Sequence, residues 1–364
     1  MSDTVKQTTE ERRDELVGRL FEAVLGMNDL HMVYVGDRLG FYRALVDTGP
    51  ATPGELAAAT GTHERYVREW LEQQAVTGIL DVTEASPDGR RYSLPEGHAE
   101  VLTERDSPSY LASFARMMAG MVRPLPEVIE AFRSGGGVPY ARFDTDFCEG
   151  QAEMNRVQFV NLLGSEWLPA IPDLHARLGQ DPPARVADVA CGAGWSSIAL
   201  AKAYPGVRVD GFDLDEYSIQ LARQNLAGSG LEDRVTFEVR DAADSPLSGA
   251  YDLVTVFEAI HDLPRPVEVL RTIRNLLVEG GTVIVADERT AETFTAPGDE
   301  VERLLYGWSV LHCLPVGMSE QPSAATGTVM RAETLRAYAQ EAGFSDVEIL
   351  PIENDFWRFY RLTP

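Results

Sequence analysis

The chain has 364 residues with 57 acidic and 32 basic side chains, which gives a formal net charge of −25. This excess of acid argues against tight binding to a polyanion, because nucleic-acid affinity depends on lysines and arginines that displace counterions from phosphates. The length suggests two domains, and the hydrophobic share of 44% with 24% charged residues is typical of a globular protein. Three scattered cysteines predict neither a disulfide framework nor a metal cluster, and they favour a reducing compartment.

The first residues, 1–13, are polar and charged, without the apolar centre of a secretory signal. No apolar run approaches the roughly 18 residues that a membrane-spanning helix needs. These features predict a cytoplasmic protein that does not contact a membrane.

Helical patterns dominate the N-terminal third. Apolar residues recur at helical spacing over 9–47, which predicts two helices with a break near 27–29. Thr52 and Glu55 form a capping box at the start of the next helix. The last predicted helix covers 62–77 and turns four apolar side chains inward: Tyr66, Val67, Trp70 and Leu71.

Two short strands are predicted at 79–82 and 91–94, around a turn at 86–89. Helices followed by such a hairpin predict a winged helix, and we assign residues 1–105 to a winged-helix and dimerisation domain. Between 51 and 102 this module carries nine acidic and four basic side chains, so groove entry would bring carboxylates towards phosphates. A packing and dimerisation scaffold is therefore favoured, and a ligand-responsive transcription regulator remains the alternative.

Residues 106–180 read as a helical linker with an interruption at 134–137. Its first segment, 110–121, is rich in methionine, whose flexible side chain fills irregular space and lines adaptable pockets. Core packing is one explanation for these methionines; as the alternative, we name Met117 and Met121 as candidates for the wall of a substrate chamber.

A glycine-containing loop follows a strand predicted over 184–190 and precedes a helix. Gly192 and Gly194 allow a tight turn and a close approach of the backbone to a ligand. The next strand ends at Asp213, where a carboxylate can accept hydrogen bonds from both hydroxyls of a ribose.

Two further features separate this loop from a dinucleotide loop. Ser197 stands where a third glycine is expected, and Asp188 lies just before the loop, where a carboxylate suits an ammonium group better than a pyrophosphate. An adenosine ligand with an amino-acid tail meets these requirements, so the sequence predicts S-adenosylmethionine as the cofactor.

The run DVACGAG (188–194) resembles motif I of the class I S-adenosylmethionine-dependent methyltransferases, with Ala190 where the motif usually has glycine. The later segments follow the order of that family over about 165–364. The resemblance implies an α/β fold, with a Rossmann-like methyltransferase sheet preceded by a mostly helical winged-helix domain. Its strands are expected at 184–190, 207–213, 235–239, 251–258, 281–288, 347–351 and 356–360. It also implies cofactor contacts from Asp188, Ala190, Cys191, Gly192, Gly194, Trp195, Asp213, Leu214, Asp241, Ala242 and Phe257.

We assign 181–364 to the methyltransferase domain, with an insertion at about 289–330. The architecture resembles small-molecule methyltransferases whose N-terminal domain serves dimerisation and helps to wall the substrate site. The stretch His312–Pro315 is similar to a bacterial group of such winged-helix enzymes. Within the insertion, Tyr306, Trp308 and His312 are candidate substrate-contacting residues.

His261 is the candidate general base for methyl transfer, because it follows the fourth parallel strand at the edge where open α/β sheets bind their ligands. The His-Asp pair there resembles the catalytic histidine segment of small-molecule O-methyltransferases. Glu288, at the end of the next strand, is expected to orient the imidazole. An alternative is that His261 caps a helix or contacts the sulfonium end of the cofactor.

The sequence thus predicts methyl transfer from S-adenosylmethionine to a small organic acceptor, leaving S-adenosylhomocysteine, in a homodimer without a metal or nucleic-acid partner. Two alternatives stay open: the transcription regulator, and an enzyme that uses the same cofactor fold for another reaction. A nucleic-acid methyltransferase is opposed by the charge and by the lack of an Asn-Pro-Pro-Tyr type segment after the fourth strand.

Overall fold

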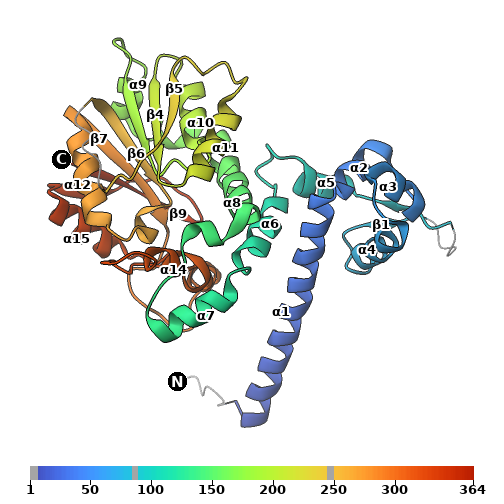
Figure 1. Cartoon of the computed structure of the whole chain (residues 1–364). Helices are drawn as coiled ribbons and strands as arrows, with labels where there is room; N and C mark the ends of the chain where they lie inside the picture. The colour runs from blue at the N-terminus through green and yellow to red at the C-terminus, as the bar shows by residue number, and fades with distance from the viewer. Residues whose placement is uncertain (1–6, 84–88, 244–249) are drawn as a thin grey trace, which may run out of the picture. The chain divides into compact units, whose positions relative to one another are not determined.

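The computed structural model describes residues 7–83, 89–243 and 250–364. The chain divides into two compact units, Met1–Ala119 and Gly120–Pro364, which are considered separately (Figure 1). Among the described residues, no helix combines the length and the apolar character needed to cross a membrane.

The N-terminal unit is built from helices and one small hairpin. Its elements are α1 (Thr9–Arg38), α2 (Phe41–Thr48), α3 (Pro53–Thr60), α4 (Glu64–Val76), β1 (Asp81–Val82), β2 (Tyr92–Ser93), α5 (Glu96–Thr103) and α6 (Ala112–Met121), the last of which ends just beyond the unit. The predicted capping box is confirmed, since Thr52 and Glu55 bond each other's backbone N–H groups. The antiparallel pairing of β1 with β2 confirms the hairpin, while the centre of its predicted turn, 86–88, lies outside the described residues.

Two local predictions in this unit are wrong. The predicted break at 27–29 is absent, because α1 runs through to Arg38 and ends before Gly40, whose φ is +69°. Asp29, which suggested the break, instead lies within the helix, where its Oδ1 accepts a hydrogen bond from Gln73 at 3.0 Å. Tyr66 is 80% exposed rather than inward-facing, because the buried face of α4 follows residues 67, 70, 71 and 74, spaced as one helical stripe.

The C-terminal unit holds a seven-stranded sheet within the described residues, ordered β5-β4-β3-β6-β7-β9-β8. Strands β3 to β7 pair in parallel, and β9 pairs antiparallel with β7 and β8. The bounds are β3 (Arg185–Val189), β4 (Arg208–Asp213), β5 (Val235–Val239), β6 (Tyr251–Phe257), β7 (Leu277–Glu288), β8 (Asp346–Ile349) and β9 (Trp357–Thr363). All the predicted strands of this unit are confirmed.

Helices cover both faces of this sheet (Figure 1). The helical elements are α7 (Leu125–Ser134), η1 (Tyr140–Arg142), α8 (Asp144–Gln158), the π-helical segment η2 (Phe159–Trp167), α9 (Pro172–Leu178), α10 (Trp195–Ala203), α11 (Glu216–Leu226), η3 (Ile260–Asp262), α12 (Pro266–Leu276), α13 (Glu300–Trp308), η4 (Ser309–Cys313), α14 (Leu314–Gly317) and α15 (Ala332–Ala342). One apolar core joins the sheet to α9, α10 and η2, and a second joins it to α12 and α15.

Strand alternation decides which core receives each side chain. On β3, Val186 belongs to the first core, whereas Ala187 and Val189 belong to the second. On β7, Val285 lies in the second core and Ala286 in the first. Polar residues at the carboxyl ends of these strands continue the same alternation.

Candidate active site

A cavity of about 380 Å³ opens in the C-terminal unit at the carboxyl ends of the parallel strands. The strand order reverses there, since the chain runs from β3 outward to β5 and then returns to β6 on the other side. Ligands of open α/β sheets bind at such a reversal. Nine residues predicted to bind the cofactor line this cavity: Ala190, Cys191, Gly192, Trp195, Asp213, Leu214, Asp241, Ala242 and Phe257.

The loop after β3 has the backbone conformation of a close-fitting turn. Ala190, Gly192 and Gly194 have positive φ values of 56°, 51° and 77°. Gly194 does not line the cavity; a Cβ atom there would lie 2.4 Å from the ring of Phe237. The lack of a side chain at Gly194 therefore lets α10 begin close to the sheet. The neighbouring loop residues, rather than Gly194, face the ligand cavity.

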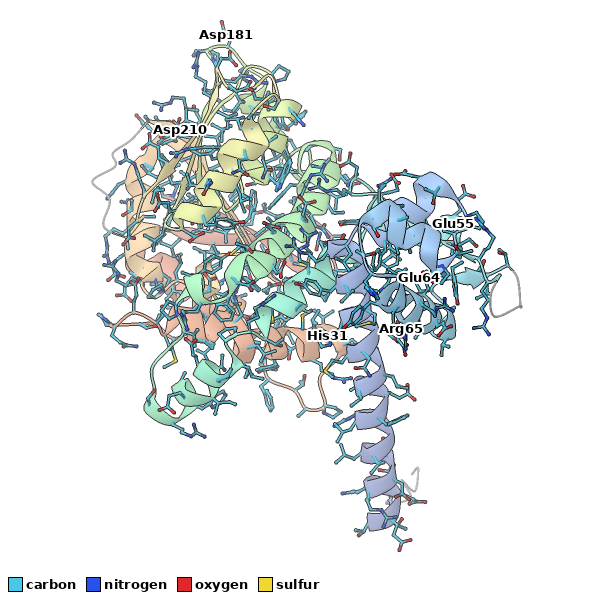
Figure 2. All side chains as sticks on the ribbon, turned by 45° about the vertical axis from the view of Figure 1, so that its right-hand side comes forward. His31, Glu55, Glu64, Arg65, Asp181 and Asp210 are labelled. Atoms are coloured by element: carbon cyan, nitrogen blue, oxygen red, sulfur yellow. The ribbon has the colours of Figure 1, made fainter. Side chains whose placement is uncertain are left out.

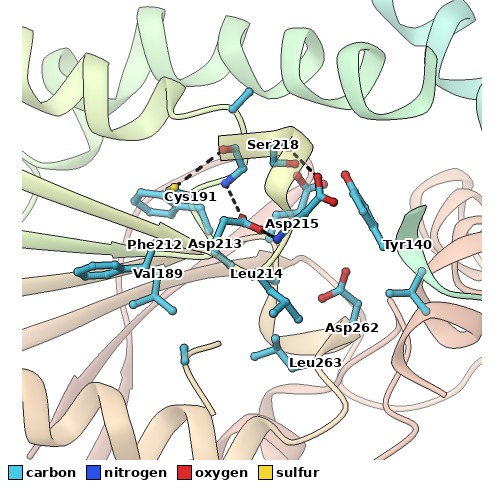
Figure 3. A pocket seen from close by; sticks show the side chains of 18 of the residues that line it. Tyr140, Val189, Cys191, Phe212, Asp213, Leu214, Asp215, Ser218, Asp262 and Leu263 are labelled. Carbon is cyan, nitrogen blue, oxygen red and sulfur yellow. Dashed lines mark hydrogen bonds between the residues drawn. The ribbon is translucent and has the colours of Figure 1, made fainter. Parts of the chain in front are cut away.

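Asp213 fastens the loop to the end of β4. Its carboxylate accepts hydrogen bonds from the N–H of Gly192 at 2.8 Å and the N–H of Asp215 at 2.9 Å (Figure 3). Burial raises the pKa of Asp213 to about 6, an effect that these two bonds oppose and the charges of Asp215 and Asp188 reinforce. The carboxylate also lines the cavity, so it is available to a ribose.

Asp188 is placed differently from the sequence expectation. Its side chain is 2% exposed and does not line the cavity. The carboxylate accepts hydrogen bonds from Ser196 Oγ at 2.5 Å, Ser197 Oγ at 2.6 Å and Thr255 Oγ1 at 2.8 Å. Strand alternation puts it on the same face as Val186, towards α10, where it ties the helix to the sheet.

Asp241, which follows β5, is held on both carboxylate oxygens. Oδ1 accepts from the N–H of Ala243 at 2.7 Å, and Oδ2 accepts from Arg265 at 3.0 Å. All three residues line the cavity. The edge beyond β5 and β4 therefore offers acidic groups at both strand ends.

His261 lies in η3, just beyond β6, and its ring is 3% exposed. Its Nδ1 is 2.7 Å from Oδ1 of Asp287, which is 1% exposed. The prediction that Glu288 orients the imidazole is wrong. On β7, Asp287 shares the face of Val285 while Glu288 shares that of Ala286, and the histidine is on the Asp287 side.

The surroundings of His261 are strongly charged. Burial acts to lower its pKa, but the charge of Asp287, the Cys313 side chain and the hydrogen bonds that the imidazole forms with both outweigh this effect, so the pKa stands well above 6.5. The next residue, Asp262, lines the cavity (Figure 3), and burial raises its pKa to about 7. His261 itself stands behind the lining residues, so Asp262 is the member of the pair that faces the cavity.

The predicted substrate residues do not gather at the cavity. Met121, Tyr306, Trp308 and His312 are not among its lining residues, and Met117 belongs to the N-terminal unit. His312 is buried between aromatic rings, with centroids 4.4 Å from Phe143 and 4.1 Å from Phe147, and burial lowers its pKa to about 3. Tyr306 is 39% exposed and accepts a hydrogen bond from Arg331.

Several lining residues were not predicted as site residues: Tyr140, Asn155, Asp215, Glu258, Asp262 and Arg265. Asp215, Glu258 and Asp262 stood beside residues that the motifs did single out. Tyr140 and Asn155 come from η1 and α8, more than 30 residues before the first motif, so only tertiary packing brings them to the site. No local pattern could have found them.

The lining residues suit S-adenosylmethionine. They combine a tight backbone turn, a carboxylate for the ribose and a predominantly acidic wall for a cationic ligand, with Asp213, Asp215, Asp241, Glu258, Asp262 and Glu320 against Arg240 and Arg265. Among the residues that the structure describes, no group of three or more His, Cys, Asp or Glu side chains is arranged to hold a metal ion.

Comparison with protein families assigns residues 180–325 to a methyltransferase domain and residues 29–104 to the "Rv2258c-like winged HTH domain". The second match confirms the predicted winged helix.

Several relatives of the chain are named as methyltransferases. The chain is 31% identical over 173 residues to a ubiquinone biosynthesis O-methyltransferase of Bordetella bronchiseptica, covering 46% of this chain and 67% of that protein. It is 29% identical over 207 residues to the protein of that name from Bordetella avium, covering 56% of this chain and 78% of the relative.

Solved structures share the fold along nearly the whole chain. Human N-acetylserotonin methyltransferase, solved in complex with S-adenosylmethionine, superposes with a TM-score of 0.68 at 19% identity and covers 100% of this chain and 99% of its own. An O-methyltransferase family protein from Burkholderia thailandensis gives a TM-score of 0.70 at 18% identity, covering 95% and 97%. With the motifs, the cavity and the relatives in agreement, the chain belongs to the class I S-adenosylmethionine-dependent methyltransferases and transfers a methyl group to a small organic acceptor.

Proposed function

We propose that the acceptor atom is a hydroxyl oxygen and that His261, supported by Asp287, takes up its proton. The observation that carries this proposal is the buried contact of 2.7 Å between His261 Nδ1 and Asp287 Oδ1, next to the cavity wall. A carboxylate on Nδ1 fixes the orientation of an imidazole and stabilises its protonated form. The names of the relatives, which include several O-methyltransferases, agree with an oxygen acceptor.

The cofactor supplies an electrophilic methyl group on a sulfonium. The protein positions the acceptor and removes its proton. The cavity holds the acceptor in line with that methyl group and excludes water, which lowers the entropic part of the barrier. Asp262 faces the cavity and can accept the hydrogen bond of the acceptor hydroxyl. Proton uptake by His261 requires that hydroxyl to replace the Cys313 thiol, which hydrogen-bonds the same imidazole.

Methyl-labelled S-adenosylmethionine tests this proposal with a panel of phenols, enediols and amines of similar size. Label should move to hydroxylated acceptors, and His261→Gln should lower kcat by about 10²- to 10⁴-fold. Cys313→Ala, which frees the ring, should retain turnover. Label transfer to amines alone, or a His261→Gln enzyme with normal kcat, would contradict the proposal.

We also propose that the winged-helix unit is a homodimer scaffold rather than a DNA reader. All four arginines between residues 51 and 102 are paired with carboxylates, in Arg65–Glu69, Arg68–Glu64, Arg90–Glu72 and Arg91–Glu55. Glu55, Glu64 and Arg65 all lie in this unit (Figure 2). The carboxylate beside each arginine places negative charge where a phosphate would have to approach.

The surface of α1 supports the dimer. Along one side of this helix, large apolar residues are 40–63% exposed: Leu16, Val17, Leu20, Phe21, Val24, Leu25, Met27 and Leu30. The spacing of three and four residues makes a continuous stripe of the kind that packs against another helix. A second copy of the chain carries the same stripe and is the partner we propose.

The three cysteines are free thiols, which supports a reducing, cytoplasmic location.

A further inference from the structure

One carboxylate of the cavity wall has no role in the proposed proton transfer. Glu258 follows β6 and is partly buried, and its side chain lines the cavity. Its φ of +54° is unusual for a residue with a side chain and carries a conformational cost that folded proteins tend to retain at functional sites. Its N–H donates to the carbonyl of Ala286 at 2.7 Å, which holds this conformation against β7.

Two neighbours hold the carboxylate of Glu258 in place and favour its ionised form. Asn155 Nδ2 donates a hydrogen bond to Glu258 Oε2 from α8. The carboxyl of Glu288 forms a second hydrogen bond with Glu258. Burial raises the pKa of Glu258, and the charge of His261 and the hydrogen bonds with Asn155 and Glu288 oppose that rise. Glu288 is 2% exposed and has a pKa well above its usual value, chiefly through burial. Since the pKa of Glu288 is raised further above its usual range, the proton shared by the pair resides on Glu288, and Glu258 is the member that faces the cavity.

The position of Glu258 follows from the sheet. Val189 of β3 is in register with Val256 of β6, so Cys191 of the loop and Glu258 each lie two residues beyond this pair. Ala190 and Glu258 both leave their strands through positive φ values. Glu258 therefore stands beside the loop on the side opposite Asp213, since the strand order is β4-β3-β6.

The cofactor is a linear molecule of adenine, ribose and amino-acid tail. With Asp241 after β5 and Asp213 after β4 at its adenosine part, the tail continues across the β3 loop towards β6. The α-ammonium group at its end needs a carboxylate. Asp188, to which the sequence assigns that task, is occupied by three hydroxyl groups and stands off the cavity wall.

We propose that Glu258, positioned by Asn155 and Glu288, binds the α-ammonium group of S-adenosylmethionine. Glu288 thus acts through Glu258 rather than through His261. The proposal rests on the cofactor assignment and adds the residue that recognises its tail.

Calorimetry with two ligands isolates this contact. The ligands are S-adenosylhomocysteine and its analogue in which hydrogen replaces the α-amino group, so neither carries a sulfonium charge. The wild-type protein should bind the first about 10- to 100-fold more tightly, the range expected for a hydrogen bond between charged groups. In Glu258→Gln this ratio should fall towards 1, because affinity is lost only for the ligand with the ammonium group.

Further variants separate recognition from folding. Asn155→Ala should lower the ratio part of the way, whereas Glu341→Gln, a charge change on the exposed side of α15, should leave it at the wild-type value. Asp188→Asn should keep the ratio while lowering the melting temperature. An unchanged ratio in Glu258→Gln, or a loss in Asp188→Asn alone, overturns the proposal. Failure of the wild-type protein to bind either ligand would overturn the cofactor assignment as well.

Discussion

Carboxylates that are close together in this protein have different roles, because their hydrogen-bond partners and their exposure to the cavity differ. Asp188 and Asp213 both border the loop after β3, yet one accepts three internal hydroxyl groups while the other is open to the cavity. Asp287 and Glu288 are adjacent, yet they serve different partners on opposite faces of β7. Burial raises the pKa of Asp213, Asp262 and Glu288, so these three carboxylates are easier to protonate than carboxylates in water.

Cofactor affinity should depend on the ionisation of Asp213. Its pKa is raised to about 6, and only the ionised carboxylate accepts both ribose hydroxyls, so affinity is full above this pH and declines as the pH falls through it. Titration with S-adenosylhomocysteine between pH 5 and 8 measures the decline. Asp213→Asn should bind about 10- to 100-fold more weakly at pH 8 and show a flatter pH profile. A wild-type affinity that is constant over this range would contradict the assignment.

Turnover should depend on the Asp287 partner of His261. The base must be neutral to accept a proton, and its pKa lies well above 6.5, so kcat should rise with pH through a value above 6.5. Asp287→Asn removes an attractive charge and should shift this limb to lower pH while lowering kcat about 10²-fold or more. Glu288→Gln should leave the limb in place. If Asp287→Asn leaves the rise of kcat at the same pH, a group other than His261 titrates, which would contradict the proposed base.

At the scale of secondary-structure elements, the passage from β3 into α10 leaves no room for a side chain at Gly194. Gly194 has a φ of +77° and faces Phe237 at a distance that admits no side chain. Gly194→Ala should therefore lower the free energy of unfolding by about 1–3 kcal/mol, as measured by urea denaturation. Gly206→Ala, where a Cβ atom would meet nothing within 4 Å, is the matched control. Equal stability of the two variants would contradict this account of the turn.

The elements could be predicted where local chemistry determines them. Strand periodicity located the sheet, and the Thr52–Glu55 capping box located a helix start. Alternation along β7 could also have separated Asp287 from Glu288, because Val283 and Val285 mark the face of Asp287. The contact between Asn155 and Glu258 spans 103 positions, and no pattern within either segment encodes it. Tertiary packing, which the sequence analysis did not resolve, completes that part of the site.

At the scale of the whole molecule, the apolar stripe of α1 should govern assembly. Leu20→Asp combined with Val24→Asp places two charges in the stripe, which should convert the proposed dimer into a monomer because an unpaired charge is costly to bury. Sedimentation velocity reads the mass directly. Arg19→Ala, an exposed change on the same helix, should remain dimeric. A wild-type chain that sediments as a monomer would contradict the dimer proposal.

The acidic residues behind the net charge of −25 have different surroundings in the N-terminal and C-terminal units. In the winged helix, glutamates form ion pairs with the four arginines that a DNA-binding domain would use to contact phosphates. In the methyltransferase unit, acidic residues dominate the cavity wall and suit a cationic cofactor. The same composition therefore bears on both the choice of cofactor and the proposed role of the N-terminal unit.

The most direct measurement of the central claim is a crystal structure of the protein with S-adenosylhomocysteine bound. We predict that both ribose hydroxyls lie within about 3 Å of the Asp213 carboxylate, and that the sulfur faces the part of the cavity lined by Asp262, in front of His261. A ligand bound elsewhere, or one whose sulfur faces away from η3, would contradict the proposed site of methyl transfer.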